Sequence, residues 1–161
     1  MASSAVGTQI PQVSLKATEV GEVTLPQTGS WTLLYFYPKD DTPGCTKQAC
    51  TYRDTYQKFT DAGIKLYGVS MDDMDSHGAF KEKFNLNFPL ISDPEHVLAD
   101  ALGVYGDHRV ERPDGKAFEW TGLARDSFLI DPEGKVRQEW RMIDPVEGVE
   151  ATYAAAMEAM G

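Results

Sequence analysis

The feature that most constrains the fold is an almost entirely apolar and aromatic run at residues 31–37, which ends at Pro38. A run of this length without regular polar alternation is typical of a strand that is buried on both faces. Proline lacks the backbone N–H that a central strand uses for pairing, so the strand ends where Pro38 begins. We therefore expect residues 31–37 to form the central strand of a sheet that is covered on both sides.

Strand patterns and helix patterns alternate along the chain on either side of this run. The expected elements are a hairpin over 13–25 with a turn near Gly21, a helix ending at Gly63, strands over 64–71 and 88–91, helices over 75–85 and 97–103, a hairpin built from 127–130 and 136–141, and a last helix over 149–160. Residues 104–124 show no readable period and are expected to form a loop. Strands that alternate with helices are typical of an α/β fold, here a central mixed β-sheet flanked by helices on both faces, with an N-terminal β-hairpin.

Length and composition indicate a globular chain. Its 161 residues match the usual size of one domain, and the hydrophobic share of 42% and charged share of 25% are ordinary for a soluble protein. The net charge of −10, without a long basic stretch, argues against a nucleic-acid partner. The sequence has no apolar run near the roughly 18 residues that span a bilayer, and no signal-peptide pattern. We expect residues 1–161 to form a single cytoplasmic domain with no nucleic-acid or membrane partner.

The two cysteines, Cys45 and Cys50, lie close together, and in a reducing cytoplasm such a pair indicates either reactive thiols or chance. Thr42 followed by Pro43 is the pair expected at a helix N-cap and first helical position, and the Thr42 hydroxyl is expected to accept a hydrogen bond from a free backbone N–H. Cys45 is then the third helical residue, where free N–H groups and the helix dipole stabilise a thiolate. Because the dipole contributes only about 0.3 to 1 kcal/mol, a nearby cation is also needed.

The spacing of the two cysteines predicts a motion. Five residues along an α-helix correspond to a rise of about 7.5 Å, which places the two Cα atoms beyond the roughly 7 Å limit for a disulfide. A bond between Cys45 and Cys50 therefore requires the first turns of the helix to unwind, which we expect to follow oxidation of Cys45.

The residues around the cysteines match a known family. The pattern Pro38-x-x-x-Thr42-x-x-Cys45 resembles the peroxidatic motif of peroxiredoxins. Within that family, Tyr-Phe-Tyr-Pro-Lys together with Gly-Cys-Thr-x-x-Ala-Cys50 is similar to the peroxiredoxin Q subgroup, also called bacterioferritin comigratory protein. The segment Arg-Asp-Ser-Phe-Leu-Ile-Asp, which begins at Arg125, resembles the catalytic arginine segment of the family.

The resemblance covers nearly the whole chain, because residues 7–15 also resemble the N-terminal signature of the family. Two positions depart from it. Gln48 stands where many relatives carry Glu, and Asp126 places a charge beside Arg125 where an apolar residue is common. Each departure is expected to retune Arg125 or the hydrogen bonds of the active site.

The resemblance implies a thioredoxin-like fold and a thiol-dependent peroxidase that reduces hydrogen peroxide and organic hydroperoxides without a cofactor or metal. It implies that Cys45 is the peroxidatic nucleophile, and that Cys50 resolves it as an intramolecular disulfide, which thioredoxin or a similar dithiol then reduces. Thr42 would hydrogen-bond the peroxide, Arg125 would stabilise the thiolate and the transition state, and Pro38 would shield the sulfur from water. With both cysteines on one chain, a monomer is expected.

Two other functions use a pair of thiols. A thioredoxin-like disulfide reductase would have two residues between its cysteines, whereas this chain has four. A redox sensor or metal-binding module needs more soft ligands than Cys45 and Cys50 to close a zinc site. Bound zinc and thioredoxin-coupled peroxide turnover, measured side by side, separate the three functions.

Overall fold

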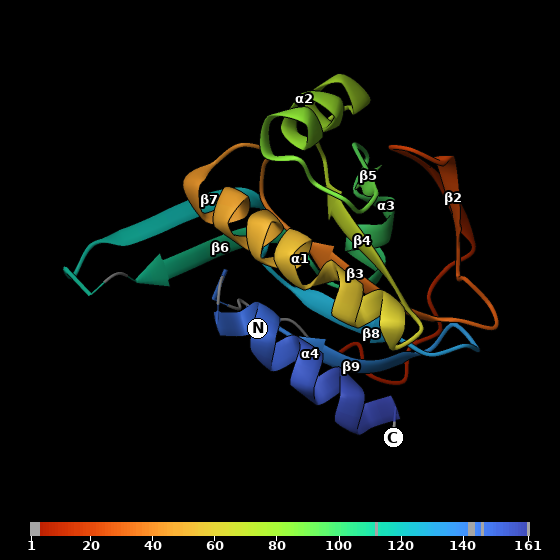
Figure 1. The fold of residues 1–161 in the computed structure, drawn as a ribbon. Helices are drawn as coiled ribbons and strands as arrows, with labels where there is room; N and C mark the ends of the chain where they lie inside the picture. The colour runs from red at the N-terminus through yellow and green to blue at the C-terminus, as the bar shows by residue number, and fades with distance from the viewer. Residues whose placement is uncertain (1–3, 112, 142–143, 146, 161) are drawn as a thin grey trace.

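The computed structural model describes residues 4–111, 113–141, 144–145 and 147–160. The helices and strands of this part of the chain are labelled in Figure 1. They are β1 Val13–Ala17, β2 Gly21–Leu25, β3 Trp31–Phe36, α1 Pro43–Asp61, β4 Ile64–Ser70, α2 Met74–Phe84, β5 Leu90–Ser92, α3 Val97–Ala101, β6 Tyr105–Glu111, β7 Ala117–Leu123, β8 Ser127–Ile130, β9 Val136–Trp140 and α4 Glu147–Met160. In the described residues, none of the helices is long and apolar enough to cross a membrane.

The main sheet is mixed and has the strand order β2-β1-β5-β4-β3-β8-β9. β3, β4 and β5 pair in parallel, whereas β1 with β2, β1 with β5, β3 with β8, and β8 with β9 pair antiparallel. Parallel neighbours need crossover connections, which α1 and α2 supply. β3 lies between β4 and β8, so the predicted central strand and the mixed sheet are both confirmed.

Helices cover both faces of the sheet, as predicted. Successive side chains of β3 point to opposite faces, so Leu34 and Phe36 pack in one core cluster while Leu33 and Tyr35 pack in the other. Buried residues of α3 belong to the first cluster, and those of α1, α2 and α4 belong to the second. In Figure 1, α1 and α4 lie in front of the sheet. Because β3 is buried on both faces, the loop that leads from it into α1 begins at a fixed position in the core.

The predicted turns of both antiparallel hairpins are present. The N-terminal hairpin of β1 and β2 has Gly21 at the turn with φ +79°. Between β8 and β9, the Asp131 side chain accepts hydrogen bonds from the N–H groups of Glu133 and Lys135, and Gly134 has φ +89°. A side-chain acceptor followed by a glycine in the left-handed region is the local chemistry of a tight turn, which sequence alone reveals.

The prediction of a loop over residues 104–124 is wrong. These residues form β6 and β7, which pair antiparallel along their whole length as a separate two-stranded sheet. The hairpin projects from the body of the molecule in Figure 1. Val110 and Phe118 on one of its faces remain 40% and 51% exposed. A hairpin with little burial on either face has little apolar alternation, so its sequence lacks the usual strand signal.

Candidate active site

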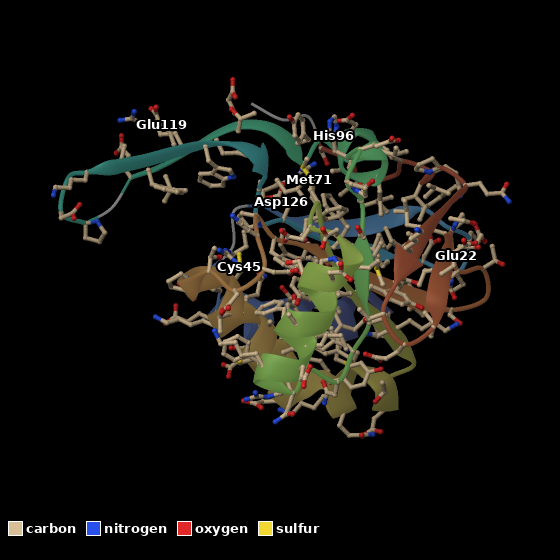
Figure 2. The ribbon with its side chains drawn as sticks, turned by 90° about the horizontal axis from the view of Figure 1, so that it is seen from above. Glu22, Cys45, Met71, His96, Glu119 and Asp126 are labelled. Atoms are coloured by element: carbon tan, nitrogen blue, oxygen red, sulfur yellow. The ribbon has the colours of Figure 1, made fainter. Side chains whose placement is uncertain are left out.

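The first turn of α1 carries the cysteine singled out by the sequence. The buried strand β3 leads into the loop of residues 37–42, and α1 begins at Pro43, which makes Cys45 the third helical residue, as predicted. Figure 2 shows Cys45 at this end of α1, on the side from which the β6–β7 hairpin projects. The N–H groups of Gly44 and Cys45 precede the first intrahelical hydrogen bond and have no acceptor within the helix. Together with the helix dipole, they create a positive potential near the sulfur.

Thr42 occupies the N-cap position, with φ −100° and ψ 154°, but its side chain does not cap the helix. Its hydroxyl instead donates a hydrogen bond to the carbonyl oxygen of Lys39, at 3.0 Å. The prediction of a hydroxyl cap is therefore wrong, because the turn before Pro43 brings a backbone acceptor within reach of the hydroxyl proton. The first-turn N–H groups consequently remain available to the sulfur or a substrate, and the Thr42 oxygen keeps its lone pairs.

Arg125 supplies the cation that is needed near the Cys45 sulfur in addition to the helix dipole. It lies between β7 and β8 and is 80 residues from Cys45 in sequence. Its Nη2 lies 3.6 Å from the Cys45 Sγ, and its Nη1 donates a hydrogen bond of 2.8 Å to the Gln48 Oε1. Two nitrogens of one planar group thus contact side chains that lie one turn apart on α1. The contact with Gln48 orients the guanidinium while the other nitrogen faces the sulfur.

The two departures from the family pattern have different surroundings. Gln48 is fully buried and contacts Arg125 directly. Because its amide is neutral, it orients the guanidinium without cancelling its positive charge. The Asp126 carboxylate is 3% exposed and accepts a hydrogen bond from Arg141 Nη1 at 3.0 Å. Gln48 is therefore the departure that acts on Arg125 by contact, whereas the Asp126 carboxylate is held by Arg141.

The candidate residues differ in their exposure to solvent. Cys45 is 1% exposed, whereas Pro38, Thr42, Cys50 and Arg125 are half-buried. Cys45 and Cys50 are both free thiols on the continuous helix α1. Among the hydrogen bonds of the described residues, none joins the Thr42 hydroxyl to the Cys45 sulfur. The structure thus brings Cys45 and Arg125 into contact and places Cys50 farther along the same helix.

Gly44, the second residue of α1, leaves the space that Arg125 occupies. A Cβ atom added at Gly44 would lie 2.8 Å from the Arg125 Nη2, closer than real contacts allow. We expect Gly44→Ala to displace the flexible guanidinium and to lower the second-order rate constant for hydrogen peroxide on the order of tenfold to a hundredfold. Shifts of about 1 Å in a reacting group have effects of that size. Stopped-flow fluorescence of the reduced protein measures the rate constant.

Gly78→Ala is the matched control, because an added Cβ at this exposed position in α2 meets nothing within 4 Å. Alanine is favoured over glycine in helices by up to about 1 kcal/mol, so neither variant is expected to lower the melting temperature. A Gly44→Ala protein that reacts at the parental rate would contradict the prediction.

Sequence reasoning missed two residues at this site, Gly44 and Asp40. Gly44 has a usable signal in the sequence, since a glycine inside a helix lowers helix stability and suggests a packing or functional reason such as close approach by another group. Asp40 lies in a charged stretch and looks exposed in the sequence, but it is only 7% exposed in the structure. Apart from Tyr37, its partners lie more than 30 residues away in sequence, so no local pattern could have identified its burial.

Known proteins are similar to this chain in both sequence and structure. The AhpC/TSA family matches residues 6–139. Peroxiredoxin Bcp of Bacillus subtilis is 42% identical over 139 residues, which cover 86% of this chain and 85% of that protein. Peroxiredoxin Q of Xanthomonas campestris is 34% identical in structure-based comparison, with a TM-score of 0.83 over 98% of this chain and 97% of the other.

A second Xanthomonas campestris structure is that of bacterioferritin comigratory protein, studied for its alkyl peroxide reduction activity. It is 31% identical, with a TM-score of 0.81 over 98% of this chain and 97% of that chain. These likenesses confirm the expected thioredoxin-like fold. Because the family match and the relatives each span most of its length, the chain belongs to the AhpC/TSA family and, within it, to the Bcp/peroxiredoxin Q peroxiredoxins, which are thiol peroxidases.

Proposed function

We propose that Cys45 is the peroxidatic cysteine of this peroxiredoxin and that Arg125, Thr42 and Pro38 complete its active site. The observation that carries the proposal is the 3.6 Å contact between the Arg125 Nη2 and the Cys45 Sγ, at the third residue of α1. A guanidinium and a helix N-terminus thus place positive charge beside one nearly buried sulfur, the atom that in this proposal attacks as a thiolate, the nucleophilic form of cysteine. The low exposure also keeps bulk water away and strengthens these electrostatic interactions.

The first step transfers an oxygen atom to sulfur. The Cys45 thiolate attacks one oxygen of the hydroperoxide, and the O–O bond breaks. The attacked oxygen stays on sulfur as a sulfenic acid, and the other oxygen leaves as hydroxide or alkoxide and takes up a proton to give water or an alcohol. Arg125 and the free N–H groups of the first turn stabilise the negative charge that moves to the leaving oxygen. The Thr42 oxygen accepts the hydrogen bond of the peroxide, and Pro38 limits the access of water. These side chains act mainly on the transition state, because thiolate formation alone accounts for only about a 30-fold gain in reactivity at pH 7.

The second step restores the sulfur through Cys50. Its thiol attacks the sulfenic sulfur of Cys45, water leaves, and an intramolecular disulfide forms. A dithiol such as thioredoxin then reduces that disulfide by thiol exchange. Hydrogen peroxide and organic hydroperoxides both serve as substrates in this proposal. In an organic hydroperoxide the thiolate attacks the oxygen that carries hydrogen, and the alkyl group leaves with the other oxygen.

Disulfide formation is expected to unwind the start of α1. In the reduced protein α1 is continuous from Pro43 to Asp61, and the rise between the cysteines is about 7.5 Å. From Arg53 onward the helix is held from outside, because Arg53 donates to the Phe84 carbonyl and its own carbonyl accepts from the Asn87 amide. On oxidation, amide hydrogen exchange measured by mass spectrometry is expected to speed up at residues 46–50 and to stay slow at 55–61.

Cys50→Ser treated with one equivalent of peroxide is the control, because it forms the sulfenic acid and cannot form the disulfide. Its exchange pattern is expected to match that of the reduced protein. Equal protection of residues 46–50 in the reduced and disulfide forms would refute the unwinding.

Residues 1–161 are proposed to act as one domain, as a monomer and in the cytoplasm. Placing both thiols on one helix supports the monomer, since resolution needs no second chain. Dependence on a dithiol donor supports a reducing compartment. Light scattering of the reduced and oxidised protein tests the oligomeric state.

The proposed function is tested by peroxide turnover. Reduced protein is expected to consume hydrogen peroxide stoichiometrically and to oxidise NADPH continuously when thioredoxin and thioredoxin reductase are present. Bound zinc is measured on the same sample. NADPH oxidation only with a disulfide substrate would indicate a disulfide reductase, and stoichiometric zinc without peroxide turnover would indicate a metal-binding module.

A further inference from the structure

A buried carboxylate lies in the loop that connects β3 to α1. The Asp40 side chain is 3% exposed, and its Oδ1 accepts a hydrogen bond of 2.6 Å from the Tyr37 hydroxyl. Its Oδ2 accepts a 2.8 Å hydrogen bond from the Ser76 hydroxyl and lies 2.7 Å from the His77 Nδ1. Burial, with the neighbouring Tyr35 and Asp40, raises the pKa of Tyr37 well above its usual range, so Tyr37 keeps its proton and donates. Asp40 thus accepts from donors in two parts of the fold, its own loop and α2.

His77 is the buried partner of this carboxyl group. The ring is fully buried in α2, with Nδ1 against Asp40 and Nε2 3.0 Å from the carbonyl oxygen of Ile91 in β5. A carbonyl oxygen only accepts, so Nε2 donates to Ile91, and Nδ1 shares a hydrogen bond of 2.7 Å with the Asp40 carboxyl group. Asp40 and His77 thus form a buried hydrogen-bonded pair whose far end is fixed to the central sheet.

The backbone of Asp40 is anchored as well. Its N–H donates a hydrogen bond of 2.7 Å to the Asp72 carboxylate, which also accepts one of 2.8 Å from the Ser70 hydroxyl at the end of β4. The partners of Asp40 outside its own loop thus lie in α2 and in the segment between β4 and α2, and they bond in turn to β4 and β5. Pro38 and Thr42 each lie two residues from Asp40 in the same loop. The loop that carries them is therefore attached to parts of the molecule other than α1.

We propose that Asp40 and His77 are positioning residues for the peroxidase reaction, because their hydrogen-bonded pair holds the Pro38–Thr42 loop in the orientation that meets the peroxide at Cys45. This inference rests on the proposed function of Cys45. The pair keeps the loop in place when α1 unwinds and re-forms, so the substrate side of the site need not be rebuilt after each turnover. A buried network of directional hydrogen bonds has strict geometry, which suits a positioning role.

The test separates peroxide reactivity from the general reactivity of the thiol. In a Cys50→Ser background, the rates of Cys45 with hydrogen peroxide and with iodoacetamide are measured for the parent and for Asp40→Asn. Asp40→Asn keeps the size of the side chain but replaces one of its two engaged oxygens with an amide NH2 donor. The peroxide rate constant is expected to fall at least about tenfold, as for misplaced substrate-binding groups, while the iodoacetamide rate changes less than about threefold. Alkylation needs no contact with the Pro38–Thr42 loop, whereas the peroxide reaction does.

Asp73→Ala is the matched control for stability. The Asp73 side chain caps α2 by accepting from the Ser76 N–H, and it has no hydrogen bond to Asp40 among those described. Asp73→Ala is expected to lower the melting temperature without changing either rate. If Asp40→Asn only repeats this behaviour, or reacts with peroxide at the parental rate, the positioning role is overturned.

Tyr37→Phe keeps the inference testable if Asp40→Asn does not fold. It removes one donor to Asp40 and keeps the aromatic ring in the core. The rate with peroxide is expected to fall about threefold while the alkylation rate stays unchanged. This loss is smaller than that expected for a fully misplaced group, because the other partners of Asp40 remain. An unchanged peroxide rate in a folded Tyr37→Phe protein overturns the inference in that case. If the parent itself is alkylated but does not react with peroxide, the proposed function of Cys45 fails instead, which is a distinct result.

Discussion

Replacing Cys45 with serine is expected to abolish peroxide consumption by the reduced protein. A serine hydroxyl does not ionise near neutral pH and forms no sulfenic acid. The variant therefore has no group at this position of α1 that can accept the oxygen atom. The substitution keeps nearly the same volume at a site that is 1% exposed, so the protein is expected to stay folded. Residual hydrogen peroxide after mixing with one equivalent of reduced protein measures the loss, and circular dichroism checks the fold.

Cys50→Ser is the matched variant and is expected to behave differently. It should consume one equivalent of peroxide at the parental rate and then stop, because the sulfenic acid on Cys45 has no internal thiol to resolve it. Mass spectrometry is expected to find one added oxygen on Cys45. Continued turnover of Cys50→Ser with thioredoxin would remove the resolving role from Cys50. One equivalent consumed by Cys45→Ser would instead make Cys50 the nucleophile.

Removing the guanidinium is expected to have the next largest effect. Arg125→Ala deletes the group 3.6 Å from the Cys45 sulfur and is expected to lower the second-order rate constant for hydrogen peroxide by about 100- to 1,000-fold. That loss corresponds to about 2.7 to 4 kcal/mol of transition-state stabilisation. Arg125→Lys retains the charge but cannot contact Gln48 and Cys45 together, so an intermediate rate is expected. Stopped-flow measurements over a range of pH also show how thiolate formation changes in each variant.

Arg109→Ala controls for the change in net charge. Arg109 lies on the exposed β6–β7 hairpin and pairs with Glu119, so its loss alters the charge of the chain without touching the sulfur. Its rate constant is expected to stay within about twofold of the parent, since an exposed pair contributes little. A similar loss in Arg109→Ala and Arg125→Ala would attribute the effect to overall charge and not to the contact.

Much of the fold could be predicted because its signals are local. The apolar run that became β3 and the turn chemistry at Asp131 and Gly134 each depend on neighbouring residues. The β6–β7 hairpin could not be predicted in the same way. Its strands bury little of either face, so the alternation that marks a strand is weak, and most of their length is held by pairing with each other.

The same difference between local and long-range signals applies to the residues of the candidate site. The Thr42-Pro43 pair correctly predicted where α1 begins, and counting from it placed Cys45 third in the helix. The hydroxyl of Thr42 was predicted to cap the helix, but it bonds to Lys39, because the shape of the loop decides which partner lies nearest. Local sequence thus predicts backbone positions more reliably than side-chain partners.

By itself, the sequence determined that a cysteine stands in the first turn of a helix after a buried strand, because helix starts and buried strands depend on residues next to one another. The tertiary structure alone decided that Arg125 reaches Cys45 across 80 residues, that Gln48 orients it, and that Asp40 is buried against His77. These contacts are formed by packing β8 and α2 around β3 and α1. The positive charge beside the sulfur therefore comes from a chain segment that meets α1 only in the folded protein.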